Sequence, residues 1–291
     1  MASITLKAPA KINLFLEVLK KRPDGYHQIV TILQEVGLAD SLTLKETPSP
    51  EIIIQCPNPH IPTDSRNLAY KAAFLLKKYV GEKKRGVIIT IEKKIPVAAG
   101  LGGGSSDAAA TLKGLNRLWK LNLDTRTLSN LAQEIGMDVP FFIQGGLGLA
   151  MGRGEEVSPL KPLPETWFVL AVSPFKVSTA WAYGHLSISP LTRKIKENRM
   201  ILKAIRAGDI VEVGRQLFNR LEEVTMKRHR ELVYLKESIL STGAKGALMS
   251  GSGPVVFGLF SSRREAWRAK EVLRKNKEEV YVVKNGRASW V

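Results

Sequence analysis

A glycine-rich stretch, Pro96–Ala110, constrains the fold of this chain more than any other segment. Gly86–Ile91 precedes it and is rich in β-branched residues, which predicts a buried strand. Asp107–Leu118 follows it with leucines at helical spacing, which predicts a helix with one face toward a core. Four glycines therefore stand where a strand turns into a helix, and glycine permits backbone conformations and close approaches that other residues resist.

Strand, glycine turn and helix start together predict an anion-binding site, because free backbone N–H groups and the helix dipole favour a phosphate. Ser105, Ser106 and Asp107 are residues that often cap helices, so we expect the helix to begin with them. The stretch lacks the Gly-Lys-Ser/Thr ending of a Walker A loop and the register of a dinucleotide fingerprint. We interpret it as a loop that holds the phosphates of ATP, with a tight flexible turn as the alternative. The candidate nucleotide-binding residues are Pro96, Val97, Ala98, Ala99, Gly100, Leu101, Gly102, Gly103, Gly104, Ser105 and Ser106.

The composition indicates a soluble globular protein of 291 residues, large enough for one big domain or two ordinary ones. No apolar run is long enough to span a bilayer, and the single cysteine fits a reducing cytoplasm. The formal net charge of +17 is scattered along the chain and is not interleaved with aromatic residues. We therefore expect mostly solvated surface charge, with some attraction for anionic substrates, and no nucleic-acid or membrane partner.

Three prolines within Ser158–Pro164 mark the best domain boundary. Before it we expect strands within residues 4–19, 28–36, 40–44, 51–55 and 145–150, with helices at 65–79 and 125–135. After it we expect strands at 167–172, 246–260 (a pair) and 279–283, and helices at 192–207, 208–240 and 263–275. That order suits an α+β sandwich of ferredoxin-like type, so we predict domains at 1–160 and 161–291.

Some polar residues outside the loop are ambiguous when each is taken alone. Lys11 and Asn13 lie two residues apart on a predicted strand and share a face, which also fits an edge strand with polar ends. Asp138 stands between a glycine-led turn and an apolar run, where an aspartate is either a helix cap or a catalytic carboxylate. Tyr26 and His27 follow a Pro-Asp-Gly turn, and a single such pair is usually structural.

Taken together, these segments resemble the GHMP kinase superfamily over nearly the whole chain. The matching segments are Ala8–Leu16, Arg22–His27, Pro96–Ala109, Asp138–Phe142, Ser178–Thr179 and Met249–Pro254. The resemblance implies a two-domain α+β fold, with an N-terminal ribosomal-protein-like α/β domain and a C-terminal ferredoxin-like α/β sandwich. The Asp-Gly-Tyr-His turn and the Gly-Gly-Gly-Ser-Ser loop are similar to the branch that acts on 4-diphosphocytidyl-2-C-methyl-D-erythritol. Ala98, Ala99 and Asp107 depart from the residues usual in that branch.

The resemblance implies that ATP phosphorylates the 2-hydroxyl of that substrate, in the non-mevalonate route to isoprenoids. The residue matching Asp138 would act as base beside Lys11, and Asn13 would touch the substrate near the acceptor. Tyr26 and Tyr183 would flank the cytosine. His27 would hydrogen-bond the edge of the base, with assistance from Thr179.

Further expectations from the resemblance are less specific. Asn67, Lys93 and Lys94 would lie near the adenine. Mg²⁺ is expected with ATP, with Ser105, Ser106 and Asp107 all open as ligands. The alternatives are another GHMP kinase, with mevalonate or homoserine as substrate, and a basic nucleic-acid-binding protein. The chain would be a monomer or a homodimer.

Overall fold

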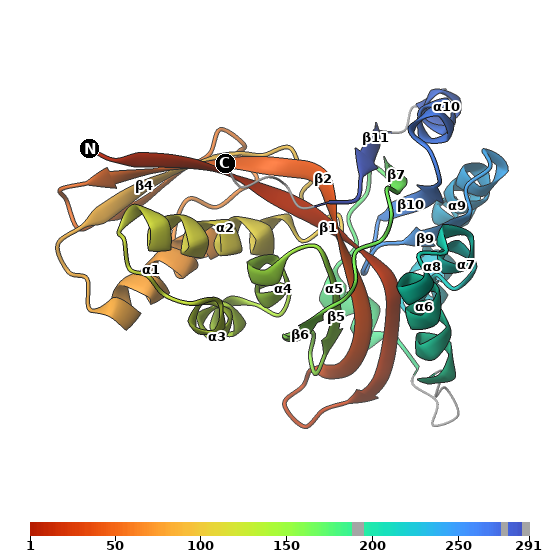
Figure 1. Cartoon of the computed structure of the whole chain (residues 1–291), viewed down its shortest axis with the longest axis horizontal. Helices are drawn as coiled ribbons and strands as arrows, with labels where there is room; N and C mark the ends of the chain where they lie inside the picture. Colours follow the sequence, from red (N-terminus) through yellow and green to blue (C-terminus); the bar gives the residue numbers. More distant parts are fainter. Residues whose placement is uncertain (188–194, 275–278, 287–291) are drawn as a thin grey trace.

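The computed structural model describes residues 1–187, 195–274 and 279–286. Two sheets form the frame of the molecule, and the long strands β1 and β2 run from one half into the other (Figure 1). The first sheet has the order β3-β4-β2-β1-β8, and β5 and β6 extend it beside β2. Its strands are β1 (Ser3–Lys21), β2 (His27–Thr47), β3 (Ile52–Gln55), β4 (Gly86–Glu92), β5 (Leu147–Met151), β6 (Glu156–Pro159) and β8 (Phe218–Asn219).

The separate strands expected within residues 4–19, and at 28–36 and 40–44, are continuous parts of β1 and β2. These two strands pair antiparallel from Ser3 opposite Lys45 to Lys21 opposite His27. The pairing shifts register between Pro9 and Ala10, Asn13 and Phe15, and Val18 and Lys20. Such bulges bend a strand and increase its twist without ending it, so the polar interruptions in the sequence do not end the strands.

Four helices cover one face of this sheet (Figure 1). They are α1 (Leu68–Val80), α2 (Gly103–Leu118), α3 (Thr125–Ile135) and α4 (Val139–Gln144). The expected start of α2 at residues 105–107 is wrong. Gly102 is its N-terminal cap residue, with a left-handed φ of 71°, and no side chain caps the helix. The amide of Ser106 already donates to Gly102 O at 2.9 Å, so Ser105, Ser106 and Asp107 lie inside the first turns.

The second sheet is antiparallel throughout, with the order β11-β7-β10-β9. This is the strand order of a ferredoxin-like unit, as predicted. Its elements are β7 (Trp167–Val172), β9 (Gly246–Met249), β10 (Val255–Phe260), α10 (Arg263–Arg274) and β11 (Glu279–Lys284). The last residue of the expected helix at 263–275 lies outside the described residues.

The helix expected over residues 208–240 is wrong, because the chain there turns back to the first sheet. The segment folds as α7 (Ile210–Arg215), β8, α8 (Glu222–Arg228) and α9 (Glu231–Ser241), preceded by α6 (Ile195–Ala207) and α5 (Thr179–Gly184). In β8, Phe218 and Asn219 pair in parallel with Phe15 and Leu16 of β1. Residues 192–194 of the helix expected at 192–207 lie outside the described residues.

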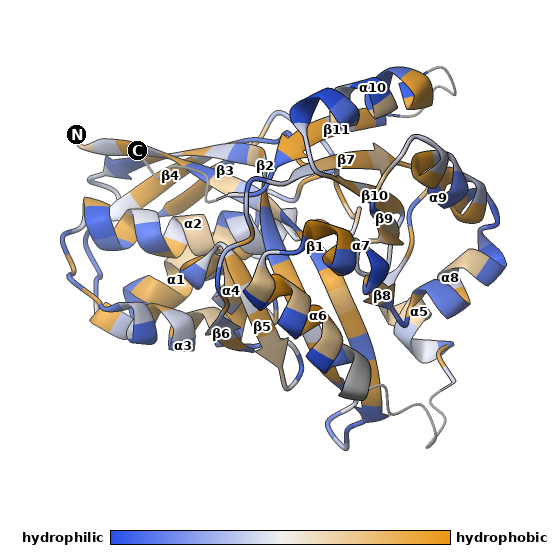
Figure 2. Cartoon of the chain, turned by 45° about the vertical axis from the view of Figure 1, so that its right-hand side comes forward, coloured by the Kyte–Doolittle hydropathy of each residue, from blue (hydrophilic) through white to orange (hydrophobic). Residues whose placement is uncertain are grey.

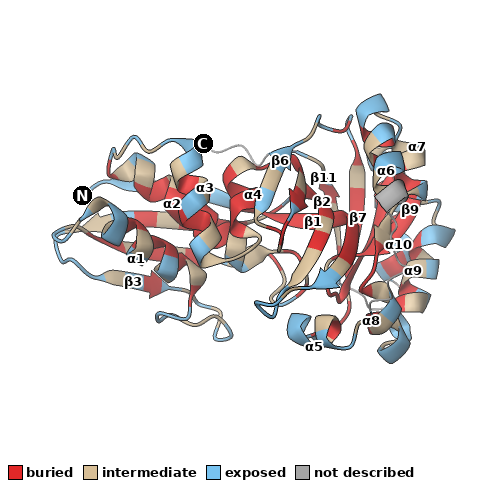
Figure 3. Ribbon diagram, turned by 90° about the horizontal axis from the view of Figure 1, so that it is seen from below, coloured by how far each residue is buried: buried red, intermediate tan, exposed pale blue. Residues whose placement is uncertain are grey.

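Both halves share buried apolar packing. One core cluster joins Ile12 and Phe15 of β1 to Phe168 of β7 and Phe257 of β10. The outer helices α8, α9 and α10 are striped blue and orange in Figure 2, whereas the strands beneath them are mostly orange. Buried residues run through the centre of the molecule, with α5 exposed at one edge (Figure 3). The domain division at 160/161 falls between β6 and β7 and stays a prediction, since β8 crosses it to join the first sheet.

Among the described residues, no helix combines the length and the apolar character needed to cross a membrane.

Candidate active site

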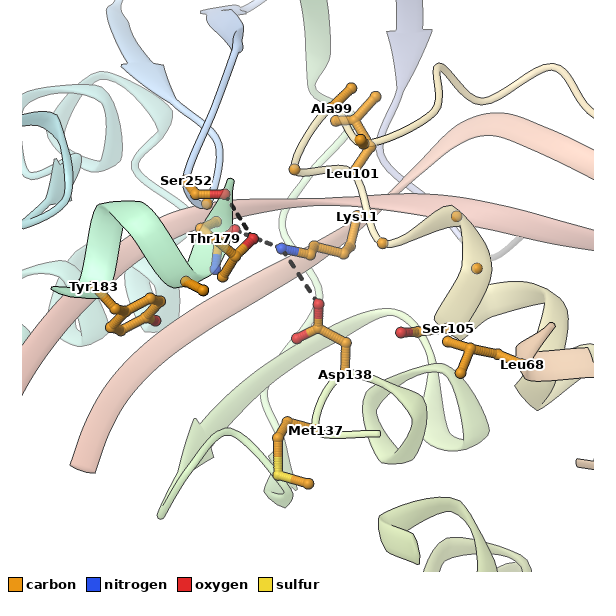
Figure 4. A pocket seen from close by; sticks show the side chains of 18 of the residues that line it. Lys11, Leu68, Ala99, Leu101, Ser105, Met137, Asp138, Thr179, Tyr183 and Ser252 are labelled. Atoms are coloured by element: carbon orange, nitrogen blue, oxygen red, sulfur yellow. Dashed lines mark hydrogen bonds and ion pairs between the residues drawn. The ribbon is translucent and has the colours of Figure 1, made fainter. Parts of the chain in front are cut away.

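A cavity of about 910 Å³ lies between the two halves of the molecule. Its walls come from the glycine-rich loop, from β1 and β2, from α5 and from the turn after β9 (Figure 4). This volume is in the range of cavities that bind small molecules. The predicted loop residues from Pro96 to Ser105 all line it, whereas Ser106 is fully buried in α2 and does not.

Left-handed backbone conformations shape the glycine-rich loop. Gly100 and Gly102 have φ values of 76° and 71°, and Ala98 adopts 57°, which is uncommon for a residue with a side chain. Lys11 N donates to Leu101 O at 3.0 Å, which fastens the loop to β1. The N-terminus of α2, a helix of 16 residues, is thereby held at the wall of the cavity. Its free N–H groups and dipole would favour an anion, and the phosphate site expected at this terminus stays a prediction.

A buried charge cluster supports the start of this loop. Lys93 forms ion pairs with Asp40 and, at 2.8 Å, with Asp107. Asp40 also accepts hydrogen bonds from the amides of Lys94 and Ile95 at 2.5 and 2.8 Å. Burial, with an added contribution from Asp40, raises the pKa of Asp107 to about 7, although Lys93 opposes the shift. The two carboxylates outweigh the opposing effect of burial and raise the pKa of Lys93.

The sequence patterns did not indicate Asp40, because its partners lie more than fifty residues away in the chain.

Lys11 and Asp138 face each other in the cavity (Figure 4). Lys11 Nζ lies 3.7 Å from Asp138 Oδ2, and the side chains are 5% and 38% exposed. Asp138 occupies the N-cap position of α4, but its side chain makes no capping hydrogen bond to the helix. Its carboxylate faces Lys11 and can interact with a ligand in the cavity.

Asn13 holds Lys11 more closely than Asp138 does. Lys11 Nζ donates to Asn13 Oδ1 at 2.7 Å, as expected for neighbours on one face of β1. Asn13 Nδ2 donates in turn to Thr31 Oγ1 at 2.9 Å. All three side chains are buried.

An aromatic group lines the end of the cavity near Asp138. The ring centroids of His27 and Tyr183 lie 5.1 Å apart, at an interplanar angle of 32°. Tyr26 is exposed, and the Arg153 guanidinium lies 5.2 Å from its ring centroid. Burial, and then the charge of Lys21, lowers the pKa of His27. Burial, and then the charge of Asp138, raises the pKa of Tyr183. The structure therefore brings Tyr26, His27 and Tyr183 together at one cavity.

The Gly-Ser turn between β9 and β10 reaches the cavity from the second half of the chain. Ser250 Oγ donates to Gly100 O at 3.1 Å, and Ser252 Oγ lies 3.0 Å from Thr179 Oγ1. Asn219 Nδ2 donates to Met249 O and Gly251 O at 2.7 Å each, which holds the turn in place. The motif was visible in the sequence but weak on its own, and no local pattern indicated Asn219.

A buried ion pair fixes the same region to β1. Arg220 donates to both carboxylate oxygens of Glu17, at 2.8 and 2.9 Å. Its amide also donates to Leu16 O at 2.8 Å. The second half of the chain is therefore fastened to the strand that carries Lys11 and Asn13.

Of the three residues expected near an adenine, two line the cavity and one does not. Asn67 lines the cavity, but its side chain caps α1 by accepting from Ala69 N at 2.8 Å. Lys93 lines it from within its ion cluster, and Lys94 is exposed beside a smaller hollow. Across residues 1–187, 195–274 and 279–286, no group of three or more His, Cys, Asp or Glu could hold a metal ion.

Comparisons with known proteins agree with this architecture. The family profile for the GHMP kinases N terminal domain matches residues 67–146, and that for GHMP kinases C terminal matches residues 201–279. A 4-diphosphocytidyl-2-C-methyl-D-erythritol kinase from Exiguobacterium sibiricum is 47% identical, with 97% of this chain and 98% of that protein covered.

Two solved structures can be compared with this fold. A crystal structure of 4-(cytidine 5'-diphospho)-2C-methyl-D-erythritol kinase superposes with a TM-score of 0.81 at 34% identity, covering 98% of this chain and 100% of that one. A homoserine kinase from Cytophaga hutchinsonii superposes with a TM-score of 0.80 at 19% identity, covering 98% and 95%, and so shares the fold. The near-complete coverage and the identity to curated relatives decide the family: this chain belongs to the 4-diphosphocytidyl-2-C-methyl-D-erythritol kinases of the GHMP superfamily.

Proposed function

We propose that this chain transfers the γ-phosphoryl group of ATP to the 2-hydroxyl of 4-diphosphocytidyl-2-C-methyl-D-erythritol, giving the 2-phosphate and ADP. The reaction belongs to the non-mevalonate pathway of isoprenoid biosynthesis. One observation carries the proposal: the Lys11–Asp138 pair and the N-terminus of α2 share a cavity with an aromatic group that can take a base.

The glycine-rich loop is the proposed donor half of the site. Backbone N–H groups from Gly102 onward and the dipole of α2 favour the phosphates of ATP. Mg²⁺ would enter with the nucleotide, held mainly by phosphate oxygens and water, and would neutralise phosphate charge. The oxygen donors at the loop fit such an ion: the Ser105 hydroxyl lies at the cavity wall, and Asp107 Oδ1 has no hydrogen-bond partner among the described residues.

Lys11 and Asp138 form the proposed acceptor half. The substrate oxygen attacks the γ-phosphorus, ADP leaves, and the hydroxyl proton goes to the Asp138 carboxylate. The carboxylate is partly exposed and its ion pair with Lys11 is long, so its oxygens remain available for that proton. Lys11 stabilises the negative charge that develops on the attacking oxygen. Phosphoryl transfer depends chiefly on alignment and charge neutralisation, so one carboxylate and one ammonium suffice here.

The aromatic group is the proposed cytosine site. Tyr26 and Tyr183 would flank the planar base and His27 would hydrogen-bond its edge, with Thr179 nearby on α5 and Asn13 at the acceptor. A histidine with a lowered pKa is neutral at physiological pH and can both donate and accept a hydrogen bond. This suits the polar edge of cytosine.

The decisive experiment measures ADP release by purified protein with ATP, Mg²⁺ and the cytidyl substrate. We expect turnover with this substrate and none with mevalonate or homoserine. Turnover with either of those would indicate another GHMP kinase. No turnover, together with tight and salt-sensitive RNA binding, would overturn the kinase proposal in favour of nucleic-acid binding.

We also propose that the enzyme is cytoplasmic and monomeric or homodimeric, with domains at 1–160 and 161–291. Size-exclusion chromatography with light scattering would determine the oligomeric state, and limited proteolysis would test the boundary near Ser158–Pro164.

A further inference from the structure

The side-chain amide of Asn13 has a defined orientation, because each of its ends meets a group of fixed hydrogen-bonding role. Its oxygen accepts from Lys11 Nζ at 2.7 Å, and an ammonium can only donate. Its nitrogen donates to Thr31 Oγ1 at 2.9 Å. Thr31 Oγ1 donates its own proton to Phe15 O at 2.7 Å, so it can only accept a hydrogen bond from Asn13. A flipped amide would set donor against donor at Lys11 and acceptor against acceptor at Thr31.

A β-bulge creates this arrangement. The pairing of β1 with β2 shifts register between Asn13 and Phe15, and the Thr31 hydroxyl meets the Phe15 carbonyl beside that shift. Bulges re-aim side chains next to functional sites. Asn13 and Thr31 are almost completely buried, so water does not readily replace a lost partner.

Lys11 depends on this amide for its position. Its Nζ lies 2.7 Å from Asn13 Oδ1 but 3.7 Å from Asp138 Oδ2, so Asn13 is the nearer partner. A small rotation of Asn13 would displace the ammonium from the place where charge develops on the acceptor oxygen. We propose that Thr31 is a positioning residue, which fixes the amide orientation of Asn13 and through it the ammonium of Lys11. This inference rests on the proposed function only for the role of Lys11.

Thr31→Val tests the proposal, because it keeps the shape of the side chain and removes the acceptor. We expect kcat with the cytidyl substrate to fall by about tenfold to about a hundredfold, the usual cost of losing one partner of a buried hydrogen bond. The KM for ATP should not change. Thr31→Ser keeps the hydroxyl and should recover most of kcat. Thr43→Val is the matched control: this residue lies on the same strand and bonds Thr5 Oγ1 at 3.0 Å, away from the cavity, so kcat should be unaffected.

A double-mutant cycle with Asn13→Ala separates positioning from general damage. If Thr31 acts through Asn13, Thr31→Val should cost nothing further in the Asn13→Ala background. The same fold-loss in both backgrounds, or a Thr31→Ser variant as slow as Thr31→Val, would overturn the proposal. Should Thr31→Val fail to fold, Thr31→Ser against Thr31→Ala makes the same comparison, since the pair differs only in the hydroxyl.

A second readout does not depend on activity. In ¹⁵N NMR spectra, assigned by comparison with Asn13→Ala, the side-chain amide protons of Asn13 should exchange slowly in wild type and fast in Thr31→Val. Slow exchange in Thr31→Val would overturn the orienting role. If the wild-type chain does not turn over the cytidyl substrate, the exchange result still decides the Thr31 inference, while the proposed function alone fails.

Discussion

Two lysine–aspartate sites flank the same glycine-rich loop, and they differ in packing. Lys93 is buried between Asp40 and Asp107, and Asp40 also accepts from the amides of Lys94 and Ile95, just before the loop. Lys11 faces Asp138 across 3.7 Å, and the carboxylate is 38% exposed. In the first site most hydrogen-bonding groups are used within the fold, with Asp107 Oδ1 left without a partner among the described residues. The second keeps capacity for a ligand.

This difference in packing suggests different roles: the Lys93 cluster supports the fold, and the Lys11–Asp138 pair serves the reaction. A buried ion pair is costly to break, because removing one partner leaves the other charge without compensation. A loose, partly solvated pair contributes little to stability but can exchange partners as a substrate arrives. We therefore expect changes at the Lys93 cluster to affect folding, and changes at Asp138 to affect turnover.

The largest expected effect is at Asp138. Asp138→Ala should lower kcat by about 10²- to 10⁴-fold, the range for loss of a general base, while ATP still binds. ADP release and calorimetric titration with ATP would measure the two effects, and urea unfolding should show little change. Turnover near that of wild type would refute the assignment of Asp138 as base. The Lys11–Asp138 pair would then have no demonstrated role in turnover.

Lys93→Met should destabilise the fold, because it breaks the buried ion cluster. It leaves Asp40 and Asp107 buried without their cation, so the free energy of unfolding should fall by about 3–5 kcal/mol. Lys94→Met is the matched control, since that side chain is exposed and the change should stay within about 0.5 kcal/mol. Equal losses of stability in urea for the two variants would contradict the supporting role of the cluster.

His27→Ala tests whether the aromatic group binds the substrate, as proposed, or only stabilises the fold. We expect a higher KM for the cytidyl substrate, because losing one partner of the hydrogen bond to the base costs about 1–3 kcal/mol of binding, with a smaller effect on kcat. Steady-state kinetics at saturating ATP would measure it. A KM equal to that of wild type would count against His27 as a cytosine contact.

The last prediction concerns pH and Asp107. The folded-state pKa of its carboxyl is raised from 3.8 to about 7, so the folded chain binds a proton that the unfolded chain releases in that window. The contribution of Asp107 to stability is thus fully present below about pH 4 and declines as pH rises toward 7. Asp107→Asn cannot titrate, so urea unfolding at several pH values should lose that decline. An unchanged slope would place the titration elsewhere.

Local pattern predicted much of this protein because the relevant interactions lie within a few residues. The strand before the loop, the shared face of Lys11 and Asn13, and the strand at 167–172 all follow from side-chain alternation and apolar runs. The start of α2 was misplaced because a glycine in a left-handed conformation replaced the expected polar cap. The prediction of a helix over 208–240 was wrong because Phe218 and Asn219 pair with β1, about two hundred residues away.

Residue order alone predicted the glycine-rich turn, the strand before it, the helix after it apart from its first turn, and the family, since these depend on short-range backbone chemistry. Three features are visible only in the folded chain: Asp138 accepts no capping hydrogen bond, Asp40 and Asp107 share Lys93, and Thr31 accepts a hydrogen bond from Asn13. Those contacts join segments far apart in the chain. They depend on how β1 pairs with β2 and how the loop and α2 pack against β2, and no local periodicity in the sequence encodes these long-range contacts.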